Sequence, residues 1–366
     1  MAALEDKEIE PLDAIEGWPR PEERFDWYGD PAAETVLLDA YRDGRMHHAW
    51  MIGGPRGIGK ATLAYRFARF AFAHPDPKAA AVRAATDLSL PADHPAFRRV
   101  AARAHPNLLT LQRPWDDKSK RYRTELTVPE IRRTVAFFGS TVGEPGWRIA
   151  IVDPADDMNA NAANALLKVL EEPPARSLFL IISHAPGRLL PTIRSRCRRL
   201  ELRAPTFAAI KAAIASQAGL AGDESDDEAD LAAHLAEGSL RRAILLREGG
   251  GVEIYRAFGR IVASLPNPDI PALHAFADRL AARGADDAYE GFLDLLRAWL
   301  DRRVRDEPEP LGGPGISPAL QAVPLARWAE VWEKANQSAT LAETLNLDRK
   351  QVVLSILMTL ARATRM

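Results

Sequence analysis

A glycine-rich loop carries the clearest chemical signal in the chain. Residues 54–62 read GPRGIGKAT and fit the phosphate-loop pattern G-x-x-x-x-G-K, between an apolar segment and a helical one. Backbone N–H groups of such a loop can bind phosphate oxygens, and Lys60 would add a positive charge. A glycine turn without a ligand is the alternative. The candidate nucleotide-binding residues are Gly54, Gly57, Gly59, Lys60, Ala61 and Thr62.

Two groups that ATP hydrolysis normally needs are replaced. Ala61 stands where a Ser or Thr hydroxyl would bind Mg²⁺, and Thr62 is one residue late, about 100° round the helix. Asp153 ends the apolar run RIAIVD and could hold Mg²⁺ through water, but Pro154 follows where a carboxylate would polarise the attacking water. We therefore expect no intrinsic ATPase activity, no required cofactor and no metal site. ATP or ADP bound without hydrolysis stays open.

Alternating strands and helices must position these residues. Segments of four to eight apolar residues predict buried strands, and apolar residues at helical spacing predict helices. The strands are expected at 49–52, 148–153 and 178–183, with helices at 61–73, 128–138 and 159–172. Asp156 and Asp157 are expected to cap the helix that follows them. Residues 74–110 show no clean period and predict short helices and loops. The fold class is therefore α/β, a parallel sheet with flanking helices.

The chain divides into four predicted regions. Residues 1–24 are rich in Pro and acidic residues and predict a loose N-terminal arm, and residues 25–205 form the α/β domain. Ala- and Leu-rich helical patterns follow, interrupted by acidic and glycine-rich stretches. They predict a small helical domain over 206–250 and a larger one over 251–366. The acidic run 223–230 is expected to be a solvated helix connection.

Composition narrows the function class. The 366 residues include 48 basic and 50 acidic side chains, so the net charge of −2 disfavours binding to nucleic acid by bulk charge. One cysteine, Cys197, excludes an intrachain disulfide or a multi-cysteine zinc site, and we expect it to be buried and inert. The start lacks a secretory signal, and no apolar run approaches the ~20 residues of a membrane span. We expect a soluble, cytoplasmic protein.

Several stretches together carry a family resemblance. They are HHAWMIGGPRGIGK (47–60), ANALLKVLEEPP (163–174), LPTIRSRCRRLEL (190–202) and GSLRRAILL (238–246). In this order and spacing they resemble bacterial clamp-loader subunits of the AAA+ class, over about residues 25–250. The resemblance implies a RecA-like AAA+ domain, a helical lid over 206–250 and a helical collar for oligomerisation over 251–366. The degenerate loop resembles delta-prime chains of DNA polymerase III rather than gamma/tau chains.

The resemblance also assigns roles to three residues. Ser195-Arg196-Cys197 matches the family's S-R-C motif, whose arginine acts as an arginine finger in the nucleotide site of a neighbouring subunit. The alternative is that Arg196 belongs to a solvated or DNA-facing arginine cluster over 188–203. Arg241 matches the sensor-2 arginine, with a structural salt bridge as the alternative. Ser183 lies near the sensor-1 position.

The chain departs from the family in one region. Many relatives carry a four-cysteine zinc module after the phosphate-loop helix, but residues 74–105 contain no cysteine, and we expect no zinc there. Widely spaced histidines do not suggest a replacement site. The basic and aromatic residues of 113–123 could contact phosphates, although a flexible surface loop is the preferred interpretation. Trp328 and Trp332 are expected to be helix-packing anchors.

The resemblance implies a role in DNA replication. The chain would be a non-hydrolysing stator in a hetero-oligomer, the clamp loader within the DNA polymerase III holoenzyme (a DNA-directed DNA polymerase), with Arg196 completing an adjacent ATP site. The implied partners are the gamma/tau and delta subunits and, through the assembly, the sliding clamp and primer-template DNA, with no membrane partner. The alternatives are an ATP-hydrolysing gamma/tau-like ATPase and a free-standing DNA-binding protein.

Overall fold

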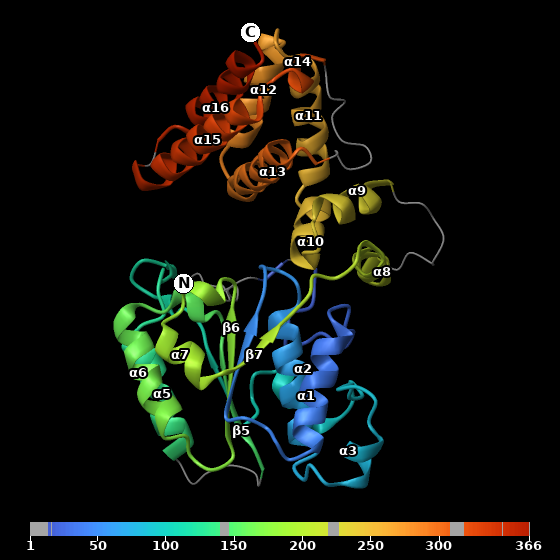
Figure 1. Cartoon of the computed structure of the whole chain (residues 1–366), viewed down its shortest axis with the longest axis vertical. Coiled ribbons are helices and arrows are strands. Elements are labelled where there is room, and N and C mark those ends of the chain that lie inside the picture. Colours follow the sequence, from blue (N-terminus) through green and yellow to red (C-terminus); the bar gives the residue numbers. More distant parts are fainter. Residues whose placement is uncertain are drawn as a thin grey trace, which may run out of the picture. The chain divides into compact units, whose positions relative to one another are not determined.

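The chain forms two compact units. The computed structural model describes residues 14–15, 17–139, 146–218, 227–307, 318–345 and 347–365. Its internal contacts divide the chain into Met1–Ala209 and Ile210–Met366. The first unit contains the sheet and the second is helical (Figure 1).

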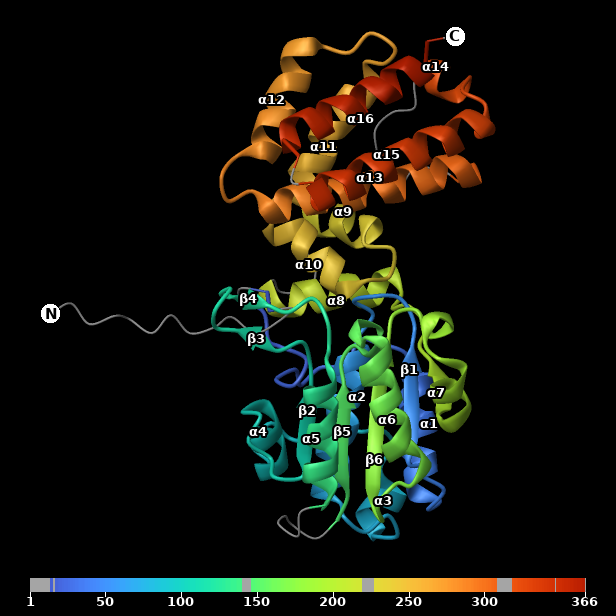
Figure 2. The same cartoon turned by 90° about the vertical axis from the view of Figure 1, so that its left-hand side faces the viewer.

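A five-stranded parallel sheet forms the centre of the first unit, in the order β2-β5-β6-β1-β7 (Figure 2). The central strands β1, β5 and β6 are almost completely buried, as their continuous apolar runs predict. The strands span Leu108–Leu111 (β2), Arg148–Val152 (β5), Ser177–Ser183 (β6), Ala49–Gly53 (β1) and Arg198–Glu201 (β7).

The two outer strands were not predicted from the sequence. We expected loops around 108–111, where four-residue β2 is only partly buried. In β7 the only buried side chain is that of Leu200, and the other three residues are charged. Each outer strand pairs on one side only, β2 with β5 and β7 with β1. The charged residues of β7 give no apolar signature, and β2, although apolar, is only four residues long.

Helices cover both faces of the sheet. Alternate residues of β1 face opposite ways: Trp50 and Ile52 pack with α1 and α2, whereas Ala49 and Met51 pack with α5 and α6. Figure 1 shows these helix pairs on the two sides of the sheet. The predicted α/β class with flanking helices is confirmed. The helices of this unit are α1 (Pro31–Arg42), α2 (Lys60–Ala73), α3 (Ala80–Ala84), α4 (Pro95–Ala101), α5 (Val128–Gly139), α6 (Ala160–Glu171) and α7 (Pro191–Arg196).

The segment before α1 packs against the first unit. The Glu22 side chain is fully buried, and its Oε1 accepts a hydrogen bond from Arg103 Nε at 2.7 Å. Arg20 Nε lies 3.5 Å from the same oxygen. A buried carboxylate requires such partners. The prediction of a loose arm is therefore wrong for residues 17–24, while residues 1–13 and 16 lie outside the described part of the chain.

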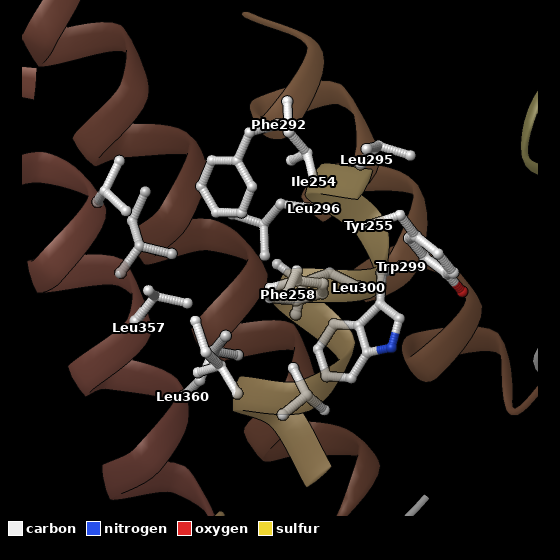
Figure 3. Packing of buried hydrophobic residues seen from close by; sticks show 14 of the residues in the cluster. Ile254, Tyr255, Phe258, Phe292, Leu295, Leu296, Trp299, Leu300, Leu357 and Leu360 are labelled. Atoms are coloured by element: carbon white, nitrogen blue, oxygen red, sulfur yellow. The ribbon is translucent and has the colours of Figure 1, made fainter. Parts of the chain in front are cut away.

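Helices build the second unit around an aromatic core (Figure 3). Phe258 and Phe292 pack edge to face at 5.8 Å, and Trp299 packs against Phe258 at 5.5 Å. Trp328 packs on Trp299 at 5.4 Å, so its predicted anchor role is confirmed. Trp332 is 42% exposed, so the same prediction is wrong for it, because it lies on the outer face of its helix.

The part predicted as a lid shares its core with the part predicted as a collar. Leu235 and Leu246 belong to the same apolar cluster as Tyr255. The helices of this unit are α8 (Phe207–Ala218), α9 (Asp227–Leu235), α10 (Leu240–Glu248), α11 (Gly251–Ala263), α12 (Ile270–Ala281), α13 (Asp286–Arg305), α14 (Pro318–Gln321), α15 (Leu325–Leu345) and α16 (Arg349–Ala363). Residues 227–230 of the predicted acidic connection are instead the first turn of α9, and residues 223–226 lie outside the described part.

Candidate functional site

The glycine-rich loop follows β1 at the carboxyl edge of the sheet and leads directly into α2. Gly54, Gly57 and Gly59 have φ values of +135°, +81° and +95°, a region that residues with a Cβ rarely adopt. A Cβ on Gly54 would also lie 2.8 Å from Ile58 Cδ1 and 3.0 Å from the Leu202 carbonyl oxygen. The loop therefore has the sharp turn and the helix start that a phosphate loop needs.

Lys60 is bound to its own loop. Its side chain is buried, and its Nζ donates to the carbonyl oxygens of Gly54 at 2.6 Å and Pro55 at 2.5 Å. Burial lowers the pKa of Lys60 from 10.5 to about 8, and the carboxylates of Asp153 and Asp156 oppose that shift. A phosphate would have to replace these carbonyl oxygens as the partner of Nζ.

The positions next to Lys60 do not supply a metal ligand. Ala61 presents only a methyl group, which packs beside the core of α1 and α2. The Thr62 side chain is buried in α2. Trp27 lies against the loop, with Cζ3 3.0 Å from the position that a Cβ of Gly59 would take. Sequence reasoning missed Trp27 because it stands in a polar segment without periodicity.

Asp156 ties the ends of β5 and β6 together. Its Oδ1 accepts hydrogen bonds from Ser183 Oγ and from the Ala185 backbone N–H, both at 3.0 Å, and its Oδ2 accepts one from the His184 N–H at 2.7 Å. The prediction that Asp156 caps the next helix is therefore wrong. Asn159 caps α6 instead, accepting from the Ala162 N–H at 2.9 Å.

The neighbouring acidic residues also have partners. Asp157 forms an ion pair with Arg113 Nε at 3.0 Å, so it is not a helix cap either. Gln112 Nε2 lies 3.4 Å from Asp153 Oδ2. Pro154 follows Asp153 with a buried side chain, so the chain places no carboxylate at that position. These groups connect β2, β5 and β6 at one edge of the sheet.

Arg196 is the last residue of α7 and its side chain is 35% exposed. Nη1 donates to the Thr192 carbonyl oxygen at 3.0 Å, and Nη2 contacts Glu171 Oε1 at 2.7 Å. Cys197 follows and is buried, which raises the pKa of its thiol to about 12. Arg198 lies over the Trp50 ring at 4.7 Å. The arginines around the S-R-C motif therefore have different surroundings.

Arg241 lies in α10, in the second unit, whereas the loop lies in the first. Its contact with nucleotide stays a prediction. Ser239 caps α10 by accepting from the Arg242 N–H at 3.2 Å. The Arg242 side chain reaches Glu237 at 3.3 Å, and Arg302 reaches the same carboxylate at 2.5 Å. The salt bridge considered as the alternative for Arg241 stays a prediction as well.

Residues 113–123 form a hairpin rather than a flexible loop. Strands β3 (Trp115–Asp116) and β4 (Arg121–Tyr122) pair antiparallel. The rings of Trp115 and Tyr122 face each other across the pair, 5.2 Å apart at 78°. The Arg123 N–H donates to the Pro114 carbonyl oxygen at 2.9 Å, which extends the pairing.

The histidines of residues 74–105 have structural contacts. His105 stacks on Phe72 at 3.8 Å, and His94 Nδ1 accepts from the Ala96 N–H at 3.1 Å at the start of α4. His74 packs against Phe70. In the described ranges, no three His, Cys, Asp or Glu side chains gather as they would around a metal ion. No helix in these ranges is long and apolar enough to cross a membrane.

Comparisons with known proteins place this site in a family. The family model "DNA polymerase III, delta subunit" matches residues 29–206. DNA polymerase III subunit delta′ of Pseudomonas aeruginosa is 39% identical over 150 residues, 41% of each chain. The Escherichia coli (strain K12) subunit delta′ is 31% identical over 169 residues, 46% of each chain. The gamma/tau subunit of Mycobacterium bovis is 28% identical over 258 residues, 68% of this chain and 40% of that one.

The parallel sheet, the phosphate loop after β1 and the helices on both faces define an AAA+ domain, here followed by helical domains. The match to the family model covers residues 29–206, and over this part of the chain the predicted resemblance to delta-prime subunits of DNA polymerase III is confirmed. The chain spans less than half the length of each of these curated relatives.

Proposed function

We propose that this chain is a non-hydrolysing stator of the DNA polymerase III clamp loader, in DNA replication. It assembles with gamma/tau and delta subunits, and Arg196 completes the ATP site of a neighbouring subunit. The assembly loads the sliding clamp onto primed DNA. The chain's own loop holds ATP or ADP without hydrolysis, or no nucleotide, and requires neither zinc nor another cofactor.

The local chemistry of the loop supports the absence of hydrolysis. A methyl group at Ala61 cannot ligate Mg²⁺. Pro154 removes the carboxylate that would polarise water. Asp156, another carboxylate close to the loop, accepts three hydrogen bonds, which hold it at the end of β6. A hydroxyl and a carboxylate that hydrolysis needs are therefore missing, and the carboxylate of Asp156 is bound within the fold.

The observation that carries the proposal is the position of Arg196. Its guanidinium is partly exposed at the end of α7, where Thr192 and Glu171 hold it by one contact each. A guanidinium offers five N–H donors in a planar fork, so donors remain for phosphoryl oxygens of a neighbour. An exposed ion pair contributes only about 0.2–1 kcal/mol, so Glu171 can release the arginine readily.

The test is ATP hydrolysis by a reconstituted loader with clamp and primed DNA, measured by rapid quench. Arg196→Ala should slow hydrolysis at the adjacent site by about 10³–10⁵-fold. The amplitude of the hydrolysis burst should decrease by the ATP bound at that site, while the subunits should still assemble. Arg196→Lys should recover little, because an ammonium lacks the planar fork. Arg199→Ala is the matched control, since Arg199 is exposed on the next strand and has no ion pair within the described residues.

Two outcomes would overturn the proposal. An unchanged burst in the Arg196→Ala assembly removes this residue from the chemistry. ATP turnover by the isolated chain, abolished by Lys60→Ala, identifies an ATPase of the gamma/tau type instead.

A further inference from the structure

The hairpin over residues 113–125 carries positive charges that the fold does not use. Lys118, Lys120 and Arg121 are exposed at or beside its tip. Within the described ranges, none of the three forms an ion pair, although Arg123 pairs with Asp116 at 3.5 Å. Three exposed cations on one short turn form a local positive patch on a chain whose net charge is −2.

Two of the neighbouring carboxylates accept hydrogen bonds at the surface of the hairpin. Asp116 Oδ1 accepts the backbone N–H groups of Lys118 at 2.9 Å and Ser119 at 3.3 Å, which closes the turn. Glu125 Oε2 accepts from Asn159 Nδ2 at 3.1 Å. Only Asp117 remains near the tip without such a role. These carboxylates stay ionised, so the five basic and three acidic side chains of residues 113–125 leave a local net charge of +2.

The same hairpin presents a hollow of about 290 Å³ with donors on its wall. Arg121, Arg123 and the hydroxyl-bearing residues Ser119, Thr124 and Thr127 line it, together with Tyr122 and the carboxylates of Asp116 and Glu125. Arginine, lysine and hydroxyl groups are the side chains that contact phosphate and sugar in protein–DNA complexes.

The hairpin also has a rigid base and a defined place on the sheet. It follows β2, and Figure 2 shows β3 and β4 beyond the carboxyl end of that strand. The Trp115–Tyr122 ring contact stabilises the pairing of the two strands that carry Arg121 and flank the turn. Because the strands are parallel, this is the same edge of the sheet from which the phosphate loop projects.

We propose that this hairpin binds the phosphate backbone of DNA directly, through Lys118, Lys120 and Arg121. The choice of DNA rests on the proposed function, which otherwise requires only Arg196 from this chain. An acidic protein partner fits less well, because among the described residues none of the exposed large apolar side chains lies in 113–127. Protein interfaces depend on such apolar anchors, whereas backbone contacts to DNA do not.

The test is the affinity of the reconstituted loader for primed DNA, by fluorescence anisotropy at several salt concentrations. Each phosphate contact contributes about 0.9 to the slope of log K against log[salt], so at 0.15 M salt it contributes about fivefold in affinity. The triple variant Lys118→Ala/Lys120→Ala/Arg121→Ala should bind on the order of 100-fold more weakly, with a slope smaller by up to about 2.7.

Two matched variants separate charge from folding. Lys118→Arg/Lys120→Arg/Arg121→Lys keeps the charges and should keep the affinity and the slope. Lys78→Ala/Arg83→Ala/Arg176→Ala removes three other exposed cations of the first unit and should change neither. An affinity and slope unchanged in the hairpin triple variant would overturn the proposal. A loss of clamp binding with normal DNA binding would overturn it too, in favour of a protein partner.

The proposed stator role and the proposed DNA contact of the hairpin can be refuted independently of each other. The hairpin triple variant should leave DNA-independent ATP hydrolysis by the loader unchanged, whereas Arg196→Ala should reduce that hydrolysis. If the chain does not assemble with gamma/tau and delta subunits, the stator role is refuted. The same salt titration on the free full-length chain then decides the hairpin contact.

Discussion

Replacing Asp156 tests the assignment of this residue to the fold rather than to catalysis. Asp156→Ala removes three acceptor contacts, from the Ser183 hydroxyl and from the N–H groups of His184 and Ala185. Ser183 is fully buried, so its donor cannot turn to water. Losing a hydrogen bond costs about 1 kcal/mol, and leaving a buried donor unsatisfied costs about 1–3 kcal/mol. Since Asp156 is only partly buried, we expect a total near the low end, about 3 kcal/mol.

The assay is a urea titration in which unfolding is monitored by hydrogen–deuterium exchange. Peptides from β5 and β6 are measured, because they report on the first unit. With a urea m-value of about 2 kcal/mol/M, the midpoint should fall by about 1.5 M. The urea midpoint of Asp156→Asn should lie between those of Asp156→Ala and the native chain. The amide oxygen of Asn can accept from Ser183 and Ala185, but its NH₂ group faces the His184 N–H, which then has no acceptor. Ser183→Ala, which removes one contact, should cost about 1 kcal/mol.

Asp157→Ala is the matched control at the adjacent position. The side chain of Asp157 forms a partly exposed ion pair with Arg113, and the loss of such a pair should cost less than about 1 kcal/mol. Equal effects of the Asp156 and Asp157 substitutions would refute the reasoning, because the three hydrogen bonds would then contribute nothing beyond a surface charge.

Two further predictions follow from ionisable groups. Burial lowers the pKa of Lys60 to about 8, below the 10.5 of an exposed lysine. Below pH 8 the buried ammonium therefore destabilises the folded state. As the pH rises, the folded chain releases this proton at a lower pH than the unfolded chain does. Between pH 8 and 10.5 the free energy of unfolding should therefore rise by up to about 3 kcal/mol relative to Lys60→Met; parallel pH profiles of the two chains would contradict this. Burial raises the pKa of Cys197 to about 12, so at pH 8 its thiol should react with a disulfide reagent about 10³-fold more slowly in the native chain than in urea, and equal rates would show an exposed thiol.

Local sequence patterns were sufficient to predict the helices and strands whose own residues show a clear apolar pattern. The strands at 148–152 and 177–183 are continuous apolar runs, and the helix at 160–171 ends before two prolines. The last helix carries a stripe of apolar residues at helical spacing, Val352, Val353, Ile356, Leu357 and Leu360, and all five are buried. In each case the residues that decide the structure lie within a few positions of one another.

The parts that the sequence did not reveal depend on contacts between distant positions. Asp156 reads as a helix cap, but its donors lie 27 to 29 residues further along the chain. Arg196 reads as one of several arginines, and its contact with Glu171 spans 25 residues. Trp27 contacts the loop at Gly59, and no periodic pattern in the sequence predicts this contact. Tertiary pairing of this kind is invisible to periodicity, because it is set by the sheet order.

The glycine-rich loop has a structural role that does not require hydrolysis. Gly54 lies against the Leu202 carbonyl oxygen, and the Leu202 N–H donates to the Gly53 carbonyl oxygen at 2.9 Å, so the loop and the end of β7 fix each other. Strand β7 pairs with β1 and begins two residues after Arg196. The conformation of the loop is therefore coupled, through one strand pair, to the helix end that presents the arginine. The glycines at positive φ therefore support the sheet edge that leads to Arg196, with or without a nucleotide in the loop.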